Sequence, residues 1–141
     1  MAKEIQIEFE GYWREANKEH VPSKSGIYCV YRCTHDAVKK EVSLHQLIYI
    51  GESQDVQSRL ANHEKLDSWK KYLKQGETLC YSFGAVPSSD RVRCEAALIF
   101  HHQPPVNTEY TGEFNYPETS IVLTGETTLL TAKFTVEPTN A

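Results

Sequence analysis

The chain has 141 residues, of which 40% are hydrophobic and 24% charged, and its formal net charge at pH 7 is −4. This size and composition favour a single globular domain, and the acidic balance argues against a general nucleic-acid binder. Lysines and arginines nevertheless gather at 59–74 and 91–93, which leaves room for one basic face. No apolar run approaches the roughly 20 residues of a membrane-spanning helix. Because the charged N-terminus also lacks an apolar signal core, we expect a cytoplasmic protein with no membrane contact.

The first half of the chain predicts three strands. Apolar and polar residues alternate at 5–10, the period-two pattern of a half-buried strand. Residues 11–20 are typical of a short helix or an irregular connector, ended by turn residues at 22–26. Residues 27–33 and 44–50 are rich in β-branched and aromatic side chains. We expect these two strands to form an antiparallel hairpin across a long, solvated loop at 34–43.

Three helices and one more strand are predicted next. Ser53 is a candidate N-cap for a helix that runs to about Glu64, in which Arg59 and His63 would lie four residues apart on one face. A second helix is expected near 68–75 and a strand at 78–86. A third helix starts at 88–90 and must end before the two prolines at 104–105.

The C-terminal part changes character. Residues 108–118 are polar and turn-rich, and two apolar runs at 121–123 and 129–136 predict a second hairpin that pairs with the N-terminal strand. We divide the single domain, 1–141, into a core at 24–107, an N-terminal strand and connector at 1–23 and a C-terminal β-hairpin extension at 108–141. The expected fold is α/β, of the α+β type: a small, mainly antiparallel three-stranded central sheet flanked by helices, with extra strands from both terminal segments.

Four cysteines stand at positions 29, 33, 80 and 94. Cys29 and Cys33 would lie about 13 Å apart in one strand, too far for a single zinc ion to bind both. We therefore expect reduced, mostly buried thiols.

Several short motifs occur in an order that resembles the GIY-YIG endonuclease family. They are Gly26-Ile27-Tyr28, Tyr49-Ile50-Gly51, Arg59, His63, Glu95 and the Pro104-Pro105-Val106-Asn107 ending. The resemblance implies an endonuclease that hydrolyses DNA phosphodiesters with one divalent cation, leaving a 5′-phosphate and a 3′-hydroxyl. Family members work in DNA repair and restriction, among other settings.

The resemblance suggests a role for each motif residue. Glu95 is the acidic residue placed to ligate the metal, and one Mg²⁺ or Mn²⁺ ion fits a single carboxylate completed by phosphate and water. Tyr28 is the first choice to take a proton from water, with a field of cations from Arg59, His63 and the metal favouring its phenolate. His63 is the alternative, as the base itself or as a relay. Tyr49 would orient the phosphate, and the planar Arg59 fork would hold it.

Two further positions are expected to support this geometry. Gly51 marks a point where the backbone bends or approaches another group closely, and Asn107 would hold the loop or the substrate through its amide. No base-reading motif is evident, so any sequence preference would come from the loop at 34–43, the C-terminal region or a dimer. Two alternatives stay open: a non-catalytic nucleic-acid-binding or assembly module on the same fold, and a nuclease that is active only with a protein partner or as a homodimer.

Overall fold

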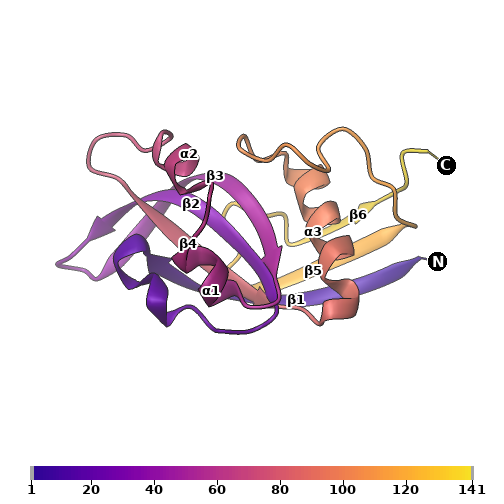
Figure 1. The fold of residues 1–141 in the computed structure, drawn as a ribbon, viewed down its shortest axis with the longest axis horizontal. Helices are drawn as coiled ribbons and strands as arrows, with labels where there is room; N and C mark the ends of the chain where they lie inside the picture. Colours follow the sequence, from indigo (N-terminus) through magenta and orange to yellow (C-terminus); the bar gives the residue numbers. More distant parts are fainter. Residues whose placement is uncertain (1, 141) are drawn as a thin grey trace.

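The computed structural model describes residues 2–140, which build one continuous, curled six-stranded sheet (Figure 1). The strands are β1 (Lys3–Arg14), β2 (Gly26–Asp36), β3 (Glu41–Ser53), β4 (Thr78–Ala85), β5 (Thr119–Gly125) and β6 (Lys133–Val136). They lie in the order β3-β2-β4-β1-β5-β6. The β1/β5 pair is parallel and the other neighbouring pairs are antiparallel.

The expected three-stranded antiparallel unit exists as β3-β2-β4, but it is half of a larger mixed sheet. β1 joins the two halves, because its residues 9–14 pair with β4 and its residues 3–9 pair with β5. The extra strands expected from both terminal segments are present, but they continue the central sheet, and the connector expected from residue 11 was wrong. The strand runs on to Arg14, and a 3₁₀ helix, η1 (Glu15–His20), follows it.

The sheet separates the hydrophobic core into two clusters, one on each face of β2, and helices pack against both clusters. α3 (Ser88–His102) packs with β1, β5 and β6 on the face of Ile27 and Cys29. α1 (Val56–Ala61) and α2 (Leu66–Lys70) pack on the face of Tyr28 and Val30. Figure 1 shows α3 over one half of the sheet and α1 and α2 over the other. None of the helices among residues 2–140 is long and apolar enough to cross a bilayer.

The expected helix 53–64 is shorter than its pattern indicated. Its N-cap is Asp55, whose carboxylate accepts a hydrogen bond from the Ser58 N–H, and Ser53 instead bonds to the Asp55 backbone. The helix ends at Ala61, so His63 does not share a helical face with Arg59. The second helix also starts earlier and is shorter than expected, at 66–70 rather than 68–75.

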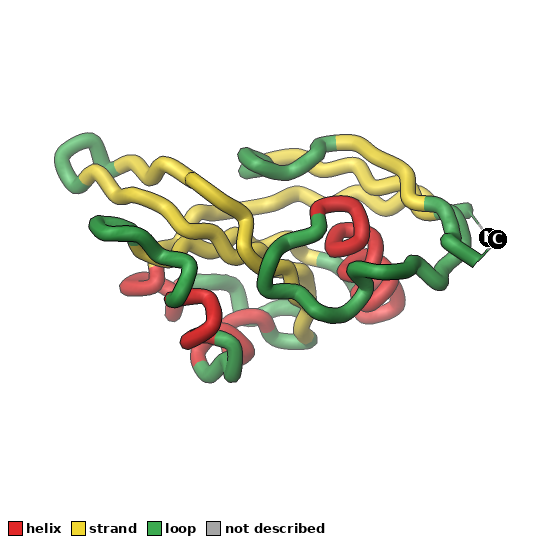
Figure 2. Tube along the Cα trace, turned by 90° about the horizontal axis from the view of Figure 1, so that it is seen from above, coloured by secondary structure: helices red, strands yellow, loops and turns green. Residues whose placement is uncertain are grey.

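A four-residue turn, 37–40, replaces the expected loop at 34–43. The strands extend to Asp36 and restart at Glu41, and Lys40 adopts φ 56° to close the turn. Figure 2 shows this hairpin tip projecting at the end of the molecule away from α3.

Two of the four cysteines form a disulfide, contrary to the expectation of reduced thiols. Cys33 of β2 and Cys80 of β4 lie on neighbouring strands with their Cα atoms 6.2 Å apart. The two cysteines are 47 residues apart in the sequence, and only the β2/β4 register brings them together, so the local pattern did not predict their pairing. Cys29 and Cys94 are free and buried, as predicted.

Candidate active site

The two motif tyrosines project from the same side of the β2–β3 hairpin. Antiparallel pairing sets Tyr28 opposite Gly51 and Tyr49 opposite Val30, so both phenol rings share one face. Their ring centroids are 6.2 Å apart, with an interplanar angle of 30°. Tyr28 is buried and Tyr49 is half-buried, so together they form one wall of a site.

Gly51 leaves the space that the Tyr28 ring occupies. A Cβ at position 51 would overlap the Cζ and Oη atoms of Tyr28. The group that this glycine approaches closely is therefore the proposed catalytic phenol itself, one strand away.

Gly51→Ala should lower DNA cleavage by about 100-fold, because the added methyl displaces the Tyr28 ring and a misplacement of about 1 Å has that cost. We expect a smaller loss of stability, about 1–3 kcal/mol, from overpacking. Single-turnover rates and thermal unfolding measure the two effects. Gly112→Ala is the matched control, because a Cβ there meets no atom within 4 Å. Cleavage by Gly51→Ala at the rate of this control would refute the packing argument.

His63 lies behind Tyr28, and its hydrogen bonds define its tautomer. The Lys65 backbone N–H donates to His63 Nδ1 at 3.1 Å, so that nitrogen carries no proton. Burial, followed by the nearby Arg59 charge, lowers the pKa of His63 to about 4, so the ring is neutral at pH 7. Its Nε2–H therefore donates to Tyr28 Oη, 2.7 Å away. The expectation that a charged His63 favours the phenolate is wrong.

Burial also opposes ionisation of the tyrosines. It raises the pKa of Tyr28 above its usual range, and the Arg59 charge offsets only part of that effect. Burial and the Glu95 charge raise the pKa of Tyr49 to about 12. Both phenols are therefore protonated at neutral pH when the protein is alone.

Arg59 presents its planar fork to a carboxylate rather than to solvent. Its Nη1 and Nη2 atoms donate to Oε2 and Oε1 of Glu64 at 2.5 and 2.7 Å. This contact lowers the pKa of Glu64 to about 2. A bidentate arginine fork fits a phosphate equally well, so Glu64 occupies the place that a phosphate would take.

Glu95 projects from α3 toward the same space. Burial raises the pKa of its carboxyl to about 8, and the negative charges of Glu52 and Glu109 add to the rise. The Glu52 backbone N–H donates to this carboxylate, while Arg91 holds the Glu52 side chain. The basic stretch expected at 91–93 is thus engaged within the fold, since Arg93 also bonds to backbone carbonyls at 117–118.

The donor set around Glu95 fits a single hard cation. Across residues 2–140, no three His, Cys, Asp or Glu side chains are grouped to hold a metal. A half-buried carboxyl crowded by two like charges would gain from a divalent cation. One or two carboxylates completed by water and phosphate form a common magnesium site, so Glu95 fits the role, with Glu52 and Glu109 adding negative potential.

Asn107 braces the edge of β3 beside Tyr49. Its Oδ1 accepts from the Ile50 N–H at 3.0 Å, and its Nδ2 donates to the Ile50 carbonyl at 2.9 Å. The neighbouring Val106 N–H donates to the Ile48 carbonyl. The amide of Asn107 therefore holds the motif strand in place, one of the two roles expected of it.

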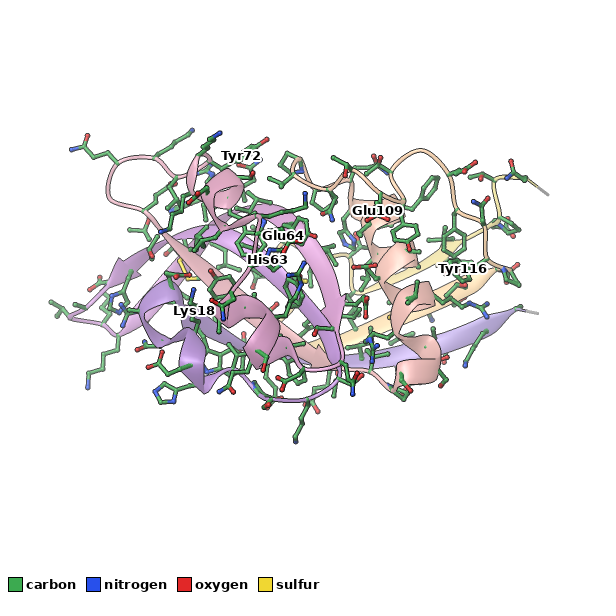
Figure 3. The ribbon with its side chains drawn as sticks, in the orientation of Figure 1. Lys18, His63, Glu64, Tyr72, Glu109 and Tyr116 are labelled. Atoms are coloured by element: carbon green, nitrogen blue, oxygen red, sulfur yellow. A yellow bond between two sulfur atoms is a disulfide. The ribbon has the colours of Figure 1, made fainter. Side chains whose placement is uncertain are left out.

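One cavity of about 300 Å³ brings most of the expected site residues together. Figure 3 labels two other residues of its lining, Glu64 and Glu109, and His63 close to Glu64. The cavity is lined by Tyr28, Tyr49, Glu52, Arg59, Glu64, Lys65, Val92, Glu95, Glu109 and Tyr110. His63, Gly51 and Asn107 do not line it. They contact Tyr28 or β3 instead. Sequence reasoning missed Glu52, Glu64 and Glu109, although each lies within five residues of a motif position.

The comparison with known families agrees with this geometry. The family model of the GIY-YIG catalytic domain matches residues 24–111. Neither the curated proteins nor the solved structures gave a significant match. The matched range covers most of the chain and contains every residue of the cavity described above. The chain belongs to the GIY-YIG family, whose domain is of the nuclease type.

Proposed function

We propose that the protein is a metal-dependent DNA endonuclease that hydrolyses phosphodiesters with one Mg²⁺ or Mn²⁺ ion, leaving a 5′-phosphate and a 3′-hydroxyl. The observation that carries this proposal is the single cavity lined by Tyr28, Tyr49, Arg59 and Glu95. These groups can cover the tasks of phosphodiester hydrolysis: the guanidinium fork can bind the phosphate, a phenol can take the proton from water, and the carboxylate can hold a cation.

Tyr28 is the proposed acceptor of the proton from the attacking water, as the phenolate that remains once its own proton has passed to solvent. The Arg59 charge lowers the pKa of Tyr28, and a cation held at Glu95 would lower it further. Its Oη accepts the His63 Nε2–H, so its own proton can point into the cavity, and the phenolate left on ionisation keeps that hydrogen bond. His63 has both ring nitrogens engaged and a fully buried side chain. We therefore assign His63 as the residue that positions Tyr28 and not as the base.

Arg59 and Tyr49 are the proposed phosphate-binding groups. Arg59 would exchange its bidentate contact with Glu64 for two oxygens of the scissile phosphate. Tyr49, protonated because its pKa is raised, would donate its O–H to a phosphate oxygen. A divalent cation at Glu95 would supply Lewis-acid stabilisation of the charge that develops on the phosphate and the departing 3′-oxygen.

Glu64→Gln should tighten DNA binding by up to about fivefold, because the exposed Arg59–Glu64 pair is worth at most about 1 kcal/mol. KM for cleavage should fall with it, while kcat stays unchanged. Fluorescence anisotropy on a labelled DNA measures the affinity. Glu41→Gln, exposed on the distant hairpin, removes the same charge and serves as the control. Equal affinities for the two variants would contradict the exchange.

Magnesium dependence should change with pH. The ligand must be ionised to bind the cation, and the pKa of Glu95 is raised to about 8. The Mg²⁺ concentration for half-maximal cleavage should therefore fall by about tenfold between pH 7 and pH 9, since binding releases a proton only below the pKa. Mg²⁺ titrations of the initial rate at each pH measure this. A midpoint independent of pH would contradict the role of Glu95.

A non-catalytic binding module is the second candidate. The Arg59–Glu64 contact counts against cleavage, because it closes the fork to a scissile phosphate. A panel of duplex, nicked, flap, fork and four-way-junction DNA, with Mg²⁺ or a chelator, separates the two. Mg²⁺-dependent cutting of any substrate supports the endonuclease. Salt-dependent binding without cutting in Mg²⁺ or Mn²⁺ supports the module, unless an added partner restores cleavage.

A further inference from the structure

The two sides of the cavity carry opposite charge. One side includes Lys65, the first residue of the basic segment, residues 65–74. This segment has four lysines and one aspartate, a formal charge of +3. On the other lies the acidic loop, residues 108–113, with two glutamates and no cation, a formal charge of −2. Lys65 and Glu109 line the same cavity. From left to right in Figure 3, three of the labelled residues are Tyr72 of the basic segment, Glu64, and Glu109 of the acidic loop.

The lysines of the basic segment are available to a ligand. Lys70, Lys71 and Lys74 are exposed. Within residues 2–140, no carboxylate comes within 4.0 Å of their ammonium groups. By contrast, Lys3 and Lys18 are paired with carboxylates. These free ammonium groups lie on a segment that begins at the cavity, where Lys65 lines it together with Arg59. Such a positive surface attracts a nucleic-acid backbone.

The acidic loop repels the same backbone. Glu109 and Glu113 are exposed, and no lysine or arginine occurs anywhere between Arg93 and Lys133. A divalent cation beside Glu95 would offset the charge of Glu109. Glu113 lines a separate outer hollow with residues 108–112 and stays uncompensated there. At physiological salt, charges act over about 8 Å, so a strand that crosses this loop meets repulsion at close range.

We propose that the cavity takes DNA from one side only. A duplex arm lies along the basic segment, and the strand is nicked, branched or ended close to the scissile phosphate, so that no backbone crosses the acidic loop. DNA interrupted at the cut site is therefore the preferred substrate over continuous duplex. The position of the cut in this inference rests on the proposed function. The preference for binding interrupted DNA does not depend on whether the protein cuts it.

Binding assays in the absence of divalent cations test the preference separately from cleavage. The wild type should bind nicked duplex several-fold more tightly than continuous duplex of the same sequence. A hydroxyl-radical footprint should protect one arm beside the nick. Equal affinities, or protection that extends equally to both sides, would overturn the proposal even if the protein cuts DNA. One-sided binding without any cutting would retain it and refute the proposed function.

Two triple variants test the basic segment. Lys70→Gln/Lys71→Gln/Lys74→Gln should weaken binding to nicked DNA by tenfold or more at low salt and reduce the slope of log affinity against log salt by roughly 2–3. Lys39→Gln/Lys40→Gln/Lys133→Gln removes the same charge from exposed positions on the hairpin tip and β6. Similar losses in the two variants would overturn the assignment.

Glu113→Gln should strengthen binding of continuous duplex more than of nicked duplex. An equal effect on both substrates would also count against the proposal.

Discussion

Tyr28→Phe should lower DNA cleavage by about 10²–10⁴-fold, the usual contribution of a positioned general base. The phenol is the group in the cavity whose oxygen is oriented by a buried histidine, at 2.7 Å. Phenylalanine keeps the ring that fills the space beside Gly51 and removes only that oxygen. Single-turnover rates under saturating Mg²⁺ measure the effect directly.

Tyr49→Phe is the control for the same substitution on the neighbouring ring. It should raise KM more than it lowers kcat, because Tyr49 is assigned to phosphate binding. Tyr28→Phe also leaves the buried His63 Nε2–H without its acceptor, which costs about 1–3 kcal/mol of stability. Thermal unfolding therefore has to show that the variant is folded at the assay temperature. A folded Tyr28→Phe that cuts at the wild-type rate would remove Tyr28 from the mechanism.

Glu95→Gln should abolish magnesium-dependent cleavage, because the amide cannot supply the anionic oxygen that a hard cation requires. Glu41→Gln, remote on the hairpin, should cut like the wild type. Magnesium-dependent cutting by purified Glu95→Gln at the wild-type rate would show that the site is wrongly assigned or that the activity is a contaminant.

Glu95→Gln should also change how the stability of the metal-free protein depends on pH. The folded pKa of Glu95, about 8, lies above the ordinary value of 4.5, so the folded state binds more protons than the unfolded state between these values. The contribution of Glu95 to the free energy of unfolding should therefore fall as pH rises from 5 to 9, whereas His63, whose folded pKa is lowered to about 4, contributes with the opposite sign below about pH 6.5. Glu95→Gln should lack this component of the pH dependence. Denaturant titrations in a chelator measure it, and identical pH profiles would contradict the raised pKa.

Local pattern was enough to predict much of the fold. The β-branched and aromatic runs predicted the β2–β3 hairpin, and antiparallel pairing then brought Tyr28 and Tyr49 to one face. Pro104 and Pro105 predicted where α3 ends, since proline stops a helix. The family motifs include four of the residues that line one cavity, Tyr28, Tyr49, Arg59 and Glu95.

Features that depend on long-range register or on competing local hydrogen bonds were not predictable in this way. The Cys33–Cys80 disulfide and the role of β1 as the bridge between two halves of the sheet both follow from pairings distant in sequence. The end of α1 at Ala61 removed the helical spacing between Arg59 and His63. Glu64 follows Arg59 by five residues. Its carboxylate reaches the Arg59 guanidinium only because the chain turns after α1.

The most direct test of the central claim is the chemistry of the cut ends. A nicked duplex labelled at both ends of the target strand is incubated with the purified wild type in Mg²⁺, in a chelator, and with Glu95→Gln in Mg²⁺. Only the first reaction should yield product strands, and these should carry a 5′-phosphate and a 3′-hydroxyl that DNA ligase can rejoin. DNA that is bound but stays intact in Mg²⁺, or cutting that persists in the chelator, would contradict a metal-dependent endonuclease.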